Sequence, residues 1–251
     1  MNNKDTVNIY WAPVVGYDIN MLGEWSMLYP NPTNLYSDIL KLKNKNSDSN
    51  AMFSCPAFKN KLKNTFVFKN SIQSEYEYDY SNLNNTFFQN SSESFIGYNQ
   101  VRKEVLGNGP TIAFNLYYIF FSEESINASF SSPFFNKAGY TKYGSVIPGE
   151  FDIGQWFRPY VFEVQLWDNS GKFIIEEDEP LFYVKFDTDK KINLQKFKHS
   201  AQLQSYAEHC TTSTKTIMFG VPLIKRYEKF KNAGMRNLIL KEIKNNIIEE
   251  Q

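Results

Sequence analysis

The sequence predicts an α+β protein that is mainly β, with a β-barrel or sandwich and amphipathic helices in its C-terminal part. Aromatic residues make up 17% of the 251 residues, and aromatic side chains favour strands. Several short segments before residue 190 alternate between apolar and polar residues, which is the period of a strand with one buried face. Apolar residues return to helical spacing after Ser200. Strands followed by helices are typical of an α+β arrangement.

The first third of the chain is expected to form short strands around two helices. Strands are predicted at residues 7–11, 65–69 and 74–80. Asn31 and Pro32 suit the cap and first position of a helix over about 33–44. Pro56–Asn64 can form a second, shorter helix.

The middle of the chain is expected to be mostly strand. Residues 82–99 are polar and predict a long loop or a sheet edge, and residues 133–148 predict a second loop. Strands are predicted at residues 111–122, 126–130, 160–167, 173–175 and 181–186. Asp168–Gly171 has the residues of a tight turn. The acidic run Glu176–Glu179 is interpreted as the tip of a hairpin between the last two strands.

The pattern changes after Thr188, and three helices are expected in the remainder. The first covers residues 200–210, the second begins at Pro222, and Gly234 separates it from the third. One stripe of the third helix is predicted to pack on the body. It consists of Met235, Leu238, Ile239, Ile243 and Ile247. We therefore expect a single domain over 1–251, in which a β-rich body (1–190) with an early helix carries a mainly helical part (191–251).

The charge balance argues against a protein that binds nucleic acid or membranes over its whole surface. Lys+Arg and Asp+Glu both total 27. The distribution is uneven, because residues 190–244 hold twelve Lys and Arg against three Glu. If nucleic acid were a partner, which the sequence does not favour, the surface would be a basic patch of Lys225, Arg226, Lys229 and Arg236. A weaker alternative uses Tyr76, Tyr78 and Tyr80 as a stacking platform for single strands.

No catalytic residue, metal site or cofactor is predicted. The two histidines, His199 and His209, and the two cysteines, Cys55 and Cys210, do not have the spacing of zinc ligands. The sequence contains neither G-x-S-x-G nor a phosphate-binding loop. No membrane partner is expected, since no apolar run approaches about 18 residues. The first residues also lack the pattern of a secretory signal peptide.

Three parts of the chain resemble uncharacterised proteins of marine tailed phages of the cyanophage type. The similar segments are Ile9–Pro13 with Trp25, Met27–Pro30 and Cys55–Ala57; then 148–186; then Val221–Tyr227. The resemblance implies a phage-encoded protein located in the host cytoplasm or in the virion, and it implies no activity.

A second, local resemblance is to the dUTPase and dCTP-deaminase family. Gly144–Gly154 is similar to the segment that builds the nucleotide pocket there, and 169–184 is similar to the last strands. This implies a β-clip or jelly-roll-like barrel with a candidate pocket at Asp152, Gln155 and Arg158. The acid expected before Pro148 and the Ser/Arg phosphate motif are absent, so the resemblance carries the fold and not the activity.

The leading hypothesis is a non-enzymatic phage-type protein that acts through protein–protein contacts, as a virion component or a host-interaction factor. The alternatives are a nucleotide-binding or nucleotide-modifying β-clip protein and a nucleic-acid binder that uses the basic C-terminal third. A protein partner is therefore expected, and the chain can also form an oligomer.

Overall fold

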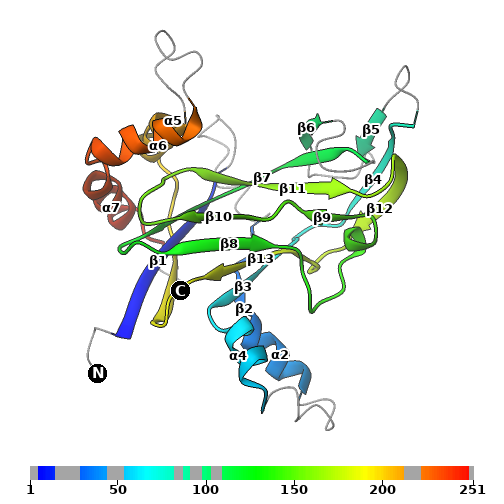
Figure 1. Cartoon of the computed structure of the whole chain (residues 1–251), viewed down its shortest axis with the longest axis horizontal. Coiled ribbons are helices and arrows are strands. Elements are labelled where there is room, and N and C mark those ends of the chain that lie inside the picture. The colour runs from blue at the N-terminus through cyan, green and yellow to red at the C-terminus, as the bar shows by residue number, and fades with distance from the viewer. Residues whose placement is uncertain are drawn as a thin grey trace.

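The computed structural model describes residues 5–14, 29–43, 54–81, 87–90, 98–102, 109–211 and 222–248. Strand accounts for 43% and helix for 27% of the structure. The predicted α+β, mainly β class is therefore confirmed, and the strands form packed sheets with helices on their outer faces (Figure 1).

Sheet A is built around the long strand β7 (Thr111–Ser122). Its order is β14 (Lys191–Lys196), β1 (Thr6–Pro13), β7, β11 (Pro159–Leu166) and β9 (Gly144–Val146), and β6 (Tyr98–Arg102) also pairs with β7. β1 runs antiparallel to β7 but parallel to β14, with Thr6 opposite Lys191. β7 is apolar on both faces over its second half because both faces of the sheet are covered there.

Sheets B and C form a second layer that faces sheet A. Sheet B has the order β10 (Gly149–Asp152), β8 (Asn127–Ser131), β13 (Pro180–Phe186), β3 (Thr65–Lys69) and β2 (Thr33–Asn34). Sheet C has the order β12 (Ser170–Ile175), β4 (Ser74–Asp79) and β5 (Phe87–Asn90). The chain passes from sheet B to sheet C between β3 and β4, and it returns between β12 and β13. One pair of chain segments, β3–β4 and β12–β13, therefore runs through both sheets and connects them.

The space between the two layers is filled largely by aromatic rings. Phe68 of β3 lies 5.2 Å from Tyr118 and 5.5 Å from Phe120 of β7, measured between ring centroids. On the sheet C side, Tyr76 lies 5.1 Å from Phe114. These three pairs meet edge to face, an arrangement that the ring quadrupole favours. This core explains the high aromatic content of the sequence.

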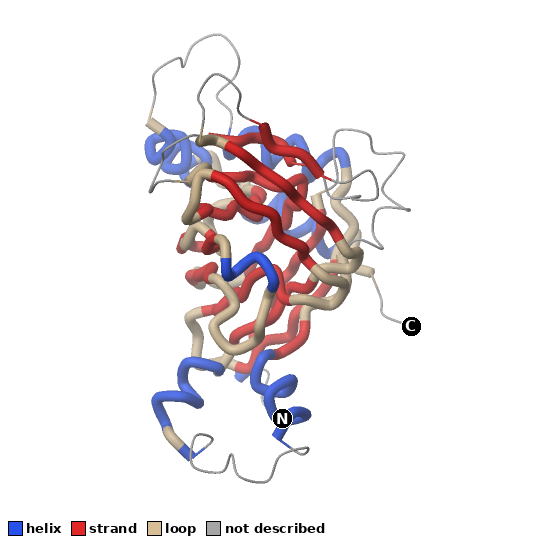
Figure 2. The backbone as a smooth tube through the Cα atoms, turned by 90° about the vertical axis from the view of Figure 1, so that its right-hand side faces the viewer, coloured by secondary structure: helices blue, strands red, loops and turns tan. Residues whose placement is uncertain are grey.

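Helices pack on the outer side of sheet A and on part of the outer side of sheet B (Figure 2). α5 (Ala201–Thr211), α6 (Leu223–Asn232) and α7 (Arg236–Asn245) pack on sheet A in a second core cluster that includes Ile119 and Phe121. α2 (Leu35–Lys43) and α4 (Pro56–Leu62) pack on sheet B over Val67 and Tyr183. The expected C-terminal helices are confirmed, and Gly234 separates α6 from α7 with a φ of +68°.

Several local predictions need correction. α2 begins at Leu35, because Thr33 and Asn34 pair with β3 and the Asn34 Oδ1 atom accepts a hydrogen bond from the Ser37 N–H at 3.2 Å. Asn34, rather than Asn31, is therefore the cap. The segment 133–148 contains a short 3-10 helix, η4 (Gly139–Lys142), and strand β9. Strand β14 was not predicted either, since only Ile192 and Leu194 alternate there.

The acidic run Glu176–Glu179 is not a hairpin tip, because β12 and β13 belong to different sheets. It forms the outer corner where the segment β12–β13 crosses from sheet C to sheet B. Asn70 occupies the inner corner, where its backbone bonds to Asp178 and Glu179 and its side-chain amide donates to the carbonyls of Ile175 and Glu176. The corner is thus fixed by polar contacts rather than by turn residues alone.

Candidate functional site: a polar groove on sheet B

The outer face of sheet B is only partly covered by helices. α2 and α4 cover the part around Val67 and Tyr183. Beyond them, Lys185 of β13 lies opposite Thr65 on β3 and opposite Ser129 on β8. Ser129 in turn lies opposite Glu150 on the edge strand β10. Because residues opposite one another in a sheet share a face, these four side chains form a row across the uncovered part.

Two adjoining hollows lie along this row, and we refer to them together as the groove. The first has a volume of about 290 Å³ and is lined by Lys61, Thr65, Ser129, Ser131, Phe134, Glu150, Lys185 and Asp187. The second has a volume of about 450 Å³ and is lined by Asn60, Lys63, Lys185, Phe186, Asp187, Thr188 and Asp189. Lys185 and Asp187 line both, so they mark the middle of the groove.

Lys185 is the central cation of the groove. Its side chain is half-buried, and its Nζ atom donates to the Asn60 carbonyl at 3.3 Å. Among the described residues, no carboxylate oxygen lies within 4.0 Å of this ammonium group. An ammonium group has three donors, so Lys185 retains hydrogen-bonding capacity that faces the groove.

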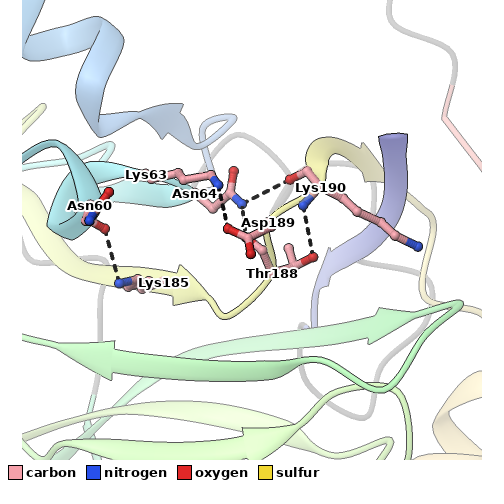
Figure 3. A network of polar contacts seen from close by, with 7 residues as sticks. All are labelled: Asn60, Lys63, Asn64, Lys185, Thr188, Asp189 and Lys190. Atoms are coloured by element: carbon pink, nitrogen blue, oxygen red, sulfur yellow. Dashed lines mark hydrogen bonds and ion pairs between the residues drawn. The ribbon is translucent and has the colours of Figure 1, made fainter. Parts of the chain in front are cut away.

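The loop of residues 186–190 forms one wall of the groove, and Asn64 fixes this loop (Figure 3). Asn64 follows the C-cap of α4 and has a φ of +55°, a conformation that asparagine tolerates better than most residues. Its Nδ2 atom donates to the Thr188 carbonyl at 2.6 Å and to the Lys190 carbonyl at 3.0 Å. The same asparagine therefore lies directly after the helix end and fixes the loop that follows β13.

Two carboxylates of the groove already have partners. Asp189 accepts from Lys63 at 2.7 Å, and this ammonium group lowers the pKa of the Asp189 carboxyl. Glu150 accepts from the Asn127 amide at 3.1 Å and from the Ser129 hydroxyl. Asp187 is exposed, and within the described part of the chain its carboxylate has no hydrogen-bond or ion-pair partner.

An aromatic rim borders the first hollow. Phe134 exposes 48% of its surface, and its ring lies at 4.9 Å and nearly perpendicular to the ring of Tyr183. The Lys61 ammonium lies 5.2 Å from the centre of the Phe134 ring, a cation–π distance. Phe135 contacts Phe58 of α4 at 5.8 Å. The rim thus joins the loop after β8 to the basic helix α4.

The structure brings together two of the three residues of the predicted pocket. The Asp152 carboxylate accepts from the backbone N–H of Ile126 at 3.2 Å and of Gly154 at 2.8 Å. It also accepts from Gln155 Nε2 at 2.5 Å and from the Ser125 hydroxyl. Asp152 therefore organises the turn after β10, and its oxygens are occupied by the protein itself.

Arg158, the third residue of the predicted pocket, contacts helix α6. Its guanidinium donates to the Tyr227 hydroxyl of α6 and lies 5.8 Å from the centre of the Tyr227 ring. Trp156 stacks on the same ring at 4.4 Å. Arg158 therefore attaches a C-terminal helix to the body, and the connection to the Asp152 turn runs through Trp156, whose backbone N–H donates to the Asp152 carbonyl at 3.0 Å.

The predicted basic patch is divided between two helices. Lys225 and Lys229 are exposed one turn apart on α6, and Arg226 beside them is half-exposed. Arg236, at the start of α7, donates to the carbonyls of Ser122 and Glu123 at the end of β7. Its guanidinium is engaged in holding α7 to sheet A.

The stacking platform suggested for β4 is wrong. Tyr76 and Tyr78 are buried in the core, and the acids Glu75, Glu77 and Asp79 occupy the outer face. Exposed rings are needed for stacking on bases. Neither tyrosine can therefore contact a nucleic acid in this fold.

Comparisons of this chain with family models, curated proteins and solved structures gave no match. In the described ranges, no three His, Cys, Asp or Glu side chains come together as a metal site would require. None of the described helices combines the length and apolar character of a transmembrane span. The candidate site therefore rests on the geometry and chemistry of the groove.

The groove itself was not predicted from the sequence. The one sequence signal that relates to it is the excess of lysines between Lys41 and Lys69, of which Lys61 and Lys63 line the groove. Lys185 gave no signal, because a lysine in an alternating strand is usually a solvated residue. Its place in the groove depends on which part of sheet B the helices leave uncovered.

Proposed function

We propose that this chain is a non-enzymatic binding protein that acts by contact with a partner protein, and that the groove on sheet B is its contact site. The observation that carries this proposal is the Lys185 ammonium in the middle of the groove, which has no carboxylate partner among the described residues. Its hydrogen bond to the Asn60 carbonyl uses one of its three donors. A ligand that accepts from the remaining donors would form charge-assisted hydrogen bonds with it.

The composition of the groove supports binding rather than catalysis. Neither a histidine nor a cysteine is among its described lining residues. Nucleophilic catalysis needs a hydroxyl or thiol beside a general base. The Ser129 hydroxyl donates to Glu150, but Glu150 is also bound by Asn127, so this carboxylate is anchored as part of the wall.

The rim supports contact with a macromolecule rather than with a small metabolite alone. The exposed face of Phe134 lies at the mouth of the groove, next to Phe135 and Lys61. Aromatic side chains that border a polar contact are common anchors in interfaces. A partner that enters the groove would also cover this rim.

Site-specific photo-crosslinking tests the proposal. A photoreactive phenylalanine analogue replaces Phe134 in one protein and Phe87 in another, and both are exposed to an extract of the cells in which the protein occurs naturally. Phe87 is the matched control, since it is an exposed phenylalanine on sheet C. We expect a discrete partner from position 134 and not from position 87, and we expect Lys185→Met to reduce its yield. Equal crosslinking from both positions would contradict the proposal.

A further inference from the structure

We infer that the ligand of the groove is a neutral glycan displayed by the partner; this inference rests on the proposed function and specifies what enters the groove. The first observation is the charge balance of the described lining. Three ammonium groups, those of Lys61, Lys63 and Lys185, face three carboxylates, those of Glu150, Asp187 and Asp189. A strongly charged ligand would be repelled by one set as it is attracted by the other.

The second observation is that the middle of the groove holds both a donor group and an acceptor group. Lys185 offers donors, and Asp187, two residues further along the same strand direction, offers acceptors. Each hydroxyl group of a sugar is one donor and two acceptors. A polyhydroxylated ligand can therefore use both kinds of group at once, without a net charge of its own.

The third observation is the position of Phe134 at the mouth of the first hollow. The C–H groups on one face of a sugar ring carry partial positive charge, and the face of an aromatic ring is negative. The Lys61 ammonium lies 5.2 Å from the centre of the Phe134 ring, and the ring still exposes 48% of its surface. This exposed part is suited to pack against a sugar, while the polar side chains of the groove bind the hydroxyl groups.

The same lining is unfavourable for the apolar surface of a protein. The centre of a protein–protein interface is depleted of charged residues. The centre of this groove is Lys185 and Asp187. Burying them under apolar side chains would leave the Asp187 carboxylate without a partner and Lys185 with the Asn60 carbonyl as its acceptor within the described residues. The hydroxyl-rich part of a glycosylated partner avoids that cost.

The test uses the full chain on an array of neutral, carboxylated, sulfated and amine-bearing oligosaccharides, each printed both directly and through a peptide. We expect retention of a neutral oligosaccharide, with little change between low and high NaCl concentration. Phe134→Ala and Lys185→Met should each weaken it at least fivefold. The matched controls, Phe87→Ala and Lys172→Met, should bind as the unmodified chain does, because both residues lie on sheet C.

Each outcome decides between the possibilities. Binding to the directly printed sugar identifies a free glycan as sufficient, and binding only through the peptide identifies a glycoprotein. Retention of acidic sugars alone, lost at high NaCl concentration, would overturn the inference. Absence of binding to every sugar on the array would also overturn it. The same holds if Lys185→Met melts normally and binds the neutral oligosaccharide as the unmodified chain does. If the crosslinked partner still binds after enzymatic deglycosylation, the inference fails while the proposed function stands.

Discussion

The carboxylate of Glu179 accepts two hydrogen bonds from the backbone N–H of Gly139, at 2.9 and 3.1 Å from its two oxygens. This contact joins the sheet corner to the start of η4, forty residues earlier in the chain. A Cβ atom at position 139 would lie 2.2 Å from the Ile174 carbonyl oxygen, so only glycine permits the approach. Glu179 also accepts from the Glu176 N–H at 3.1 Å.

The first prediction follows from this contact. Glu179→Ala leaves the N–H groups of Gly139 and Glu176 without their acceptor, and it should lower the free energy of unfolding by about 1–3 kcal/mol. Glu177→Ala is the matched control, because Glu177 is exposed two residues away and should change it by less than about 0.5 kcal/mol. Urea denaturation of both variants measures the difference. Equal values for the two variants would show that the contact is not stabilising.

The second prediction concerns Asn70, which is 1% exposed and donates its amide to backbone carbonyls at the inner corner. Asn70→Asp replaces a donor by an acceptor that faces those carbonyls. It should lower the free energy of unfolding by about 2–3 kcal/mol or more at neutral pH. Protonation of the new carboxyl restores a donor, so part of the loss should be recovered near pH 4. A loss that grows monotonically as the pH falls from 7 to 4 would contradict this account.

The third prediction concerns pH and His199. Burial lowers the pKa of this imidazole from its ordinary value of 6.5, although its Nε2 lies 2.9 Å from Gln204 Oε1. As the pH falls below 6.5, the unfolded chain binds a proton at this position that the folded chain resists. The free energy of unfolding should therefore decrease as the pH falls through this range.

Two variants isolate this effect from the titration of carboxyl groups. His199→Gln should reduce the slope of unfolding free energy against pH between about 6.5 and 5. His209→Gln, at the exposed histidine of α5, should retain the slope of the unmodified chain. Chemical denaturation at several pH values supplies the measurement. A slope that is unchanged in the His199 variant would rule out this histidine as its source.

The fourth prediction compares two neighbours on α7. Ile239 is completely buried against sheet A, whereas Leu238 is 51% exposed. Ile239→Ala should cost about 2–5 kcal/mol, because it removes buried methyl groups and leaves a cavity. Leu238→Ala should cost less than about 0.5 kcal/mol. Melting curves for the two variants provide the test, and similar losses would mean that α7 packs through a different face.

The fifth prediction concerns Asp152. Its carboxylate holds the turn after β10, so Asp152→Ala should lower the free energy of unfolding by about 1–3 kcal/mol. The unmodified chain should not hydrolyse dUTP or dCTP, and neither nucleotide should raise its melting temperature. Asp187→Ala, at an exposed acid, serves as the stability control. Hydrolysis that disappears in the Asp152 variant would instead support the nucleotide hypothesis.

Periodic segments were predicted well because burial on one face fixes their pattern. Thr111–Ser122 matches β7, and Pro56–Leu62 lies within the predicted short helix. The prediction that one stripe of the last helix packs on the body is correct for Ile239 and Ile243, which are buried, and wrong for Leu238, which is exposed. A 3.6-residue period leaves the edge of an apolar stripe undefined, and only the position of sheet A decides which edge residue is covered.

Strand partners could not be predicted, because pairing depends on contacts between distant segments. The run Glu176–Glu179 joins two strands that are adjacent in the sequence, but each pairs with a different strand. The groove could not be predicted for the same reason, because it also depends on which strands pair. Lys185 and Glu150 share a face only because β8 lies between their strands, and no local pattern in either strand encodes that neighbour.

The pairing of β1 with β14 has a consequence for the order in which the protein is made. Thr6 leaves the ribosome long before its partner Lys191, because the two strands lie far apart in the sequence. Until then, one edge of β1 exposes its backbone N–H and C=O groups, which other strands can bind. A nascent chain of this protein therefore completes its first sheet late, and its folding should be slow compared with that of helical proteins of similar length. We expect chaperones that shield unpaired strand edges to increase its yield during synthesis.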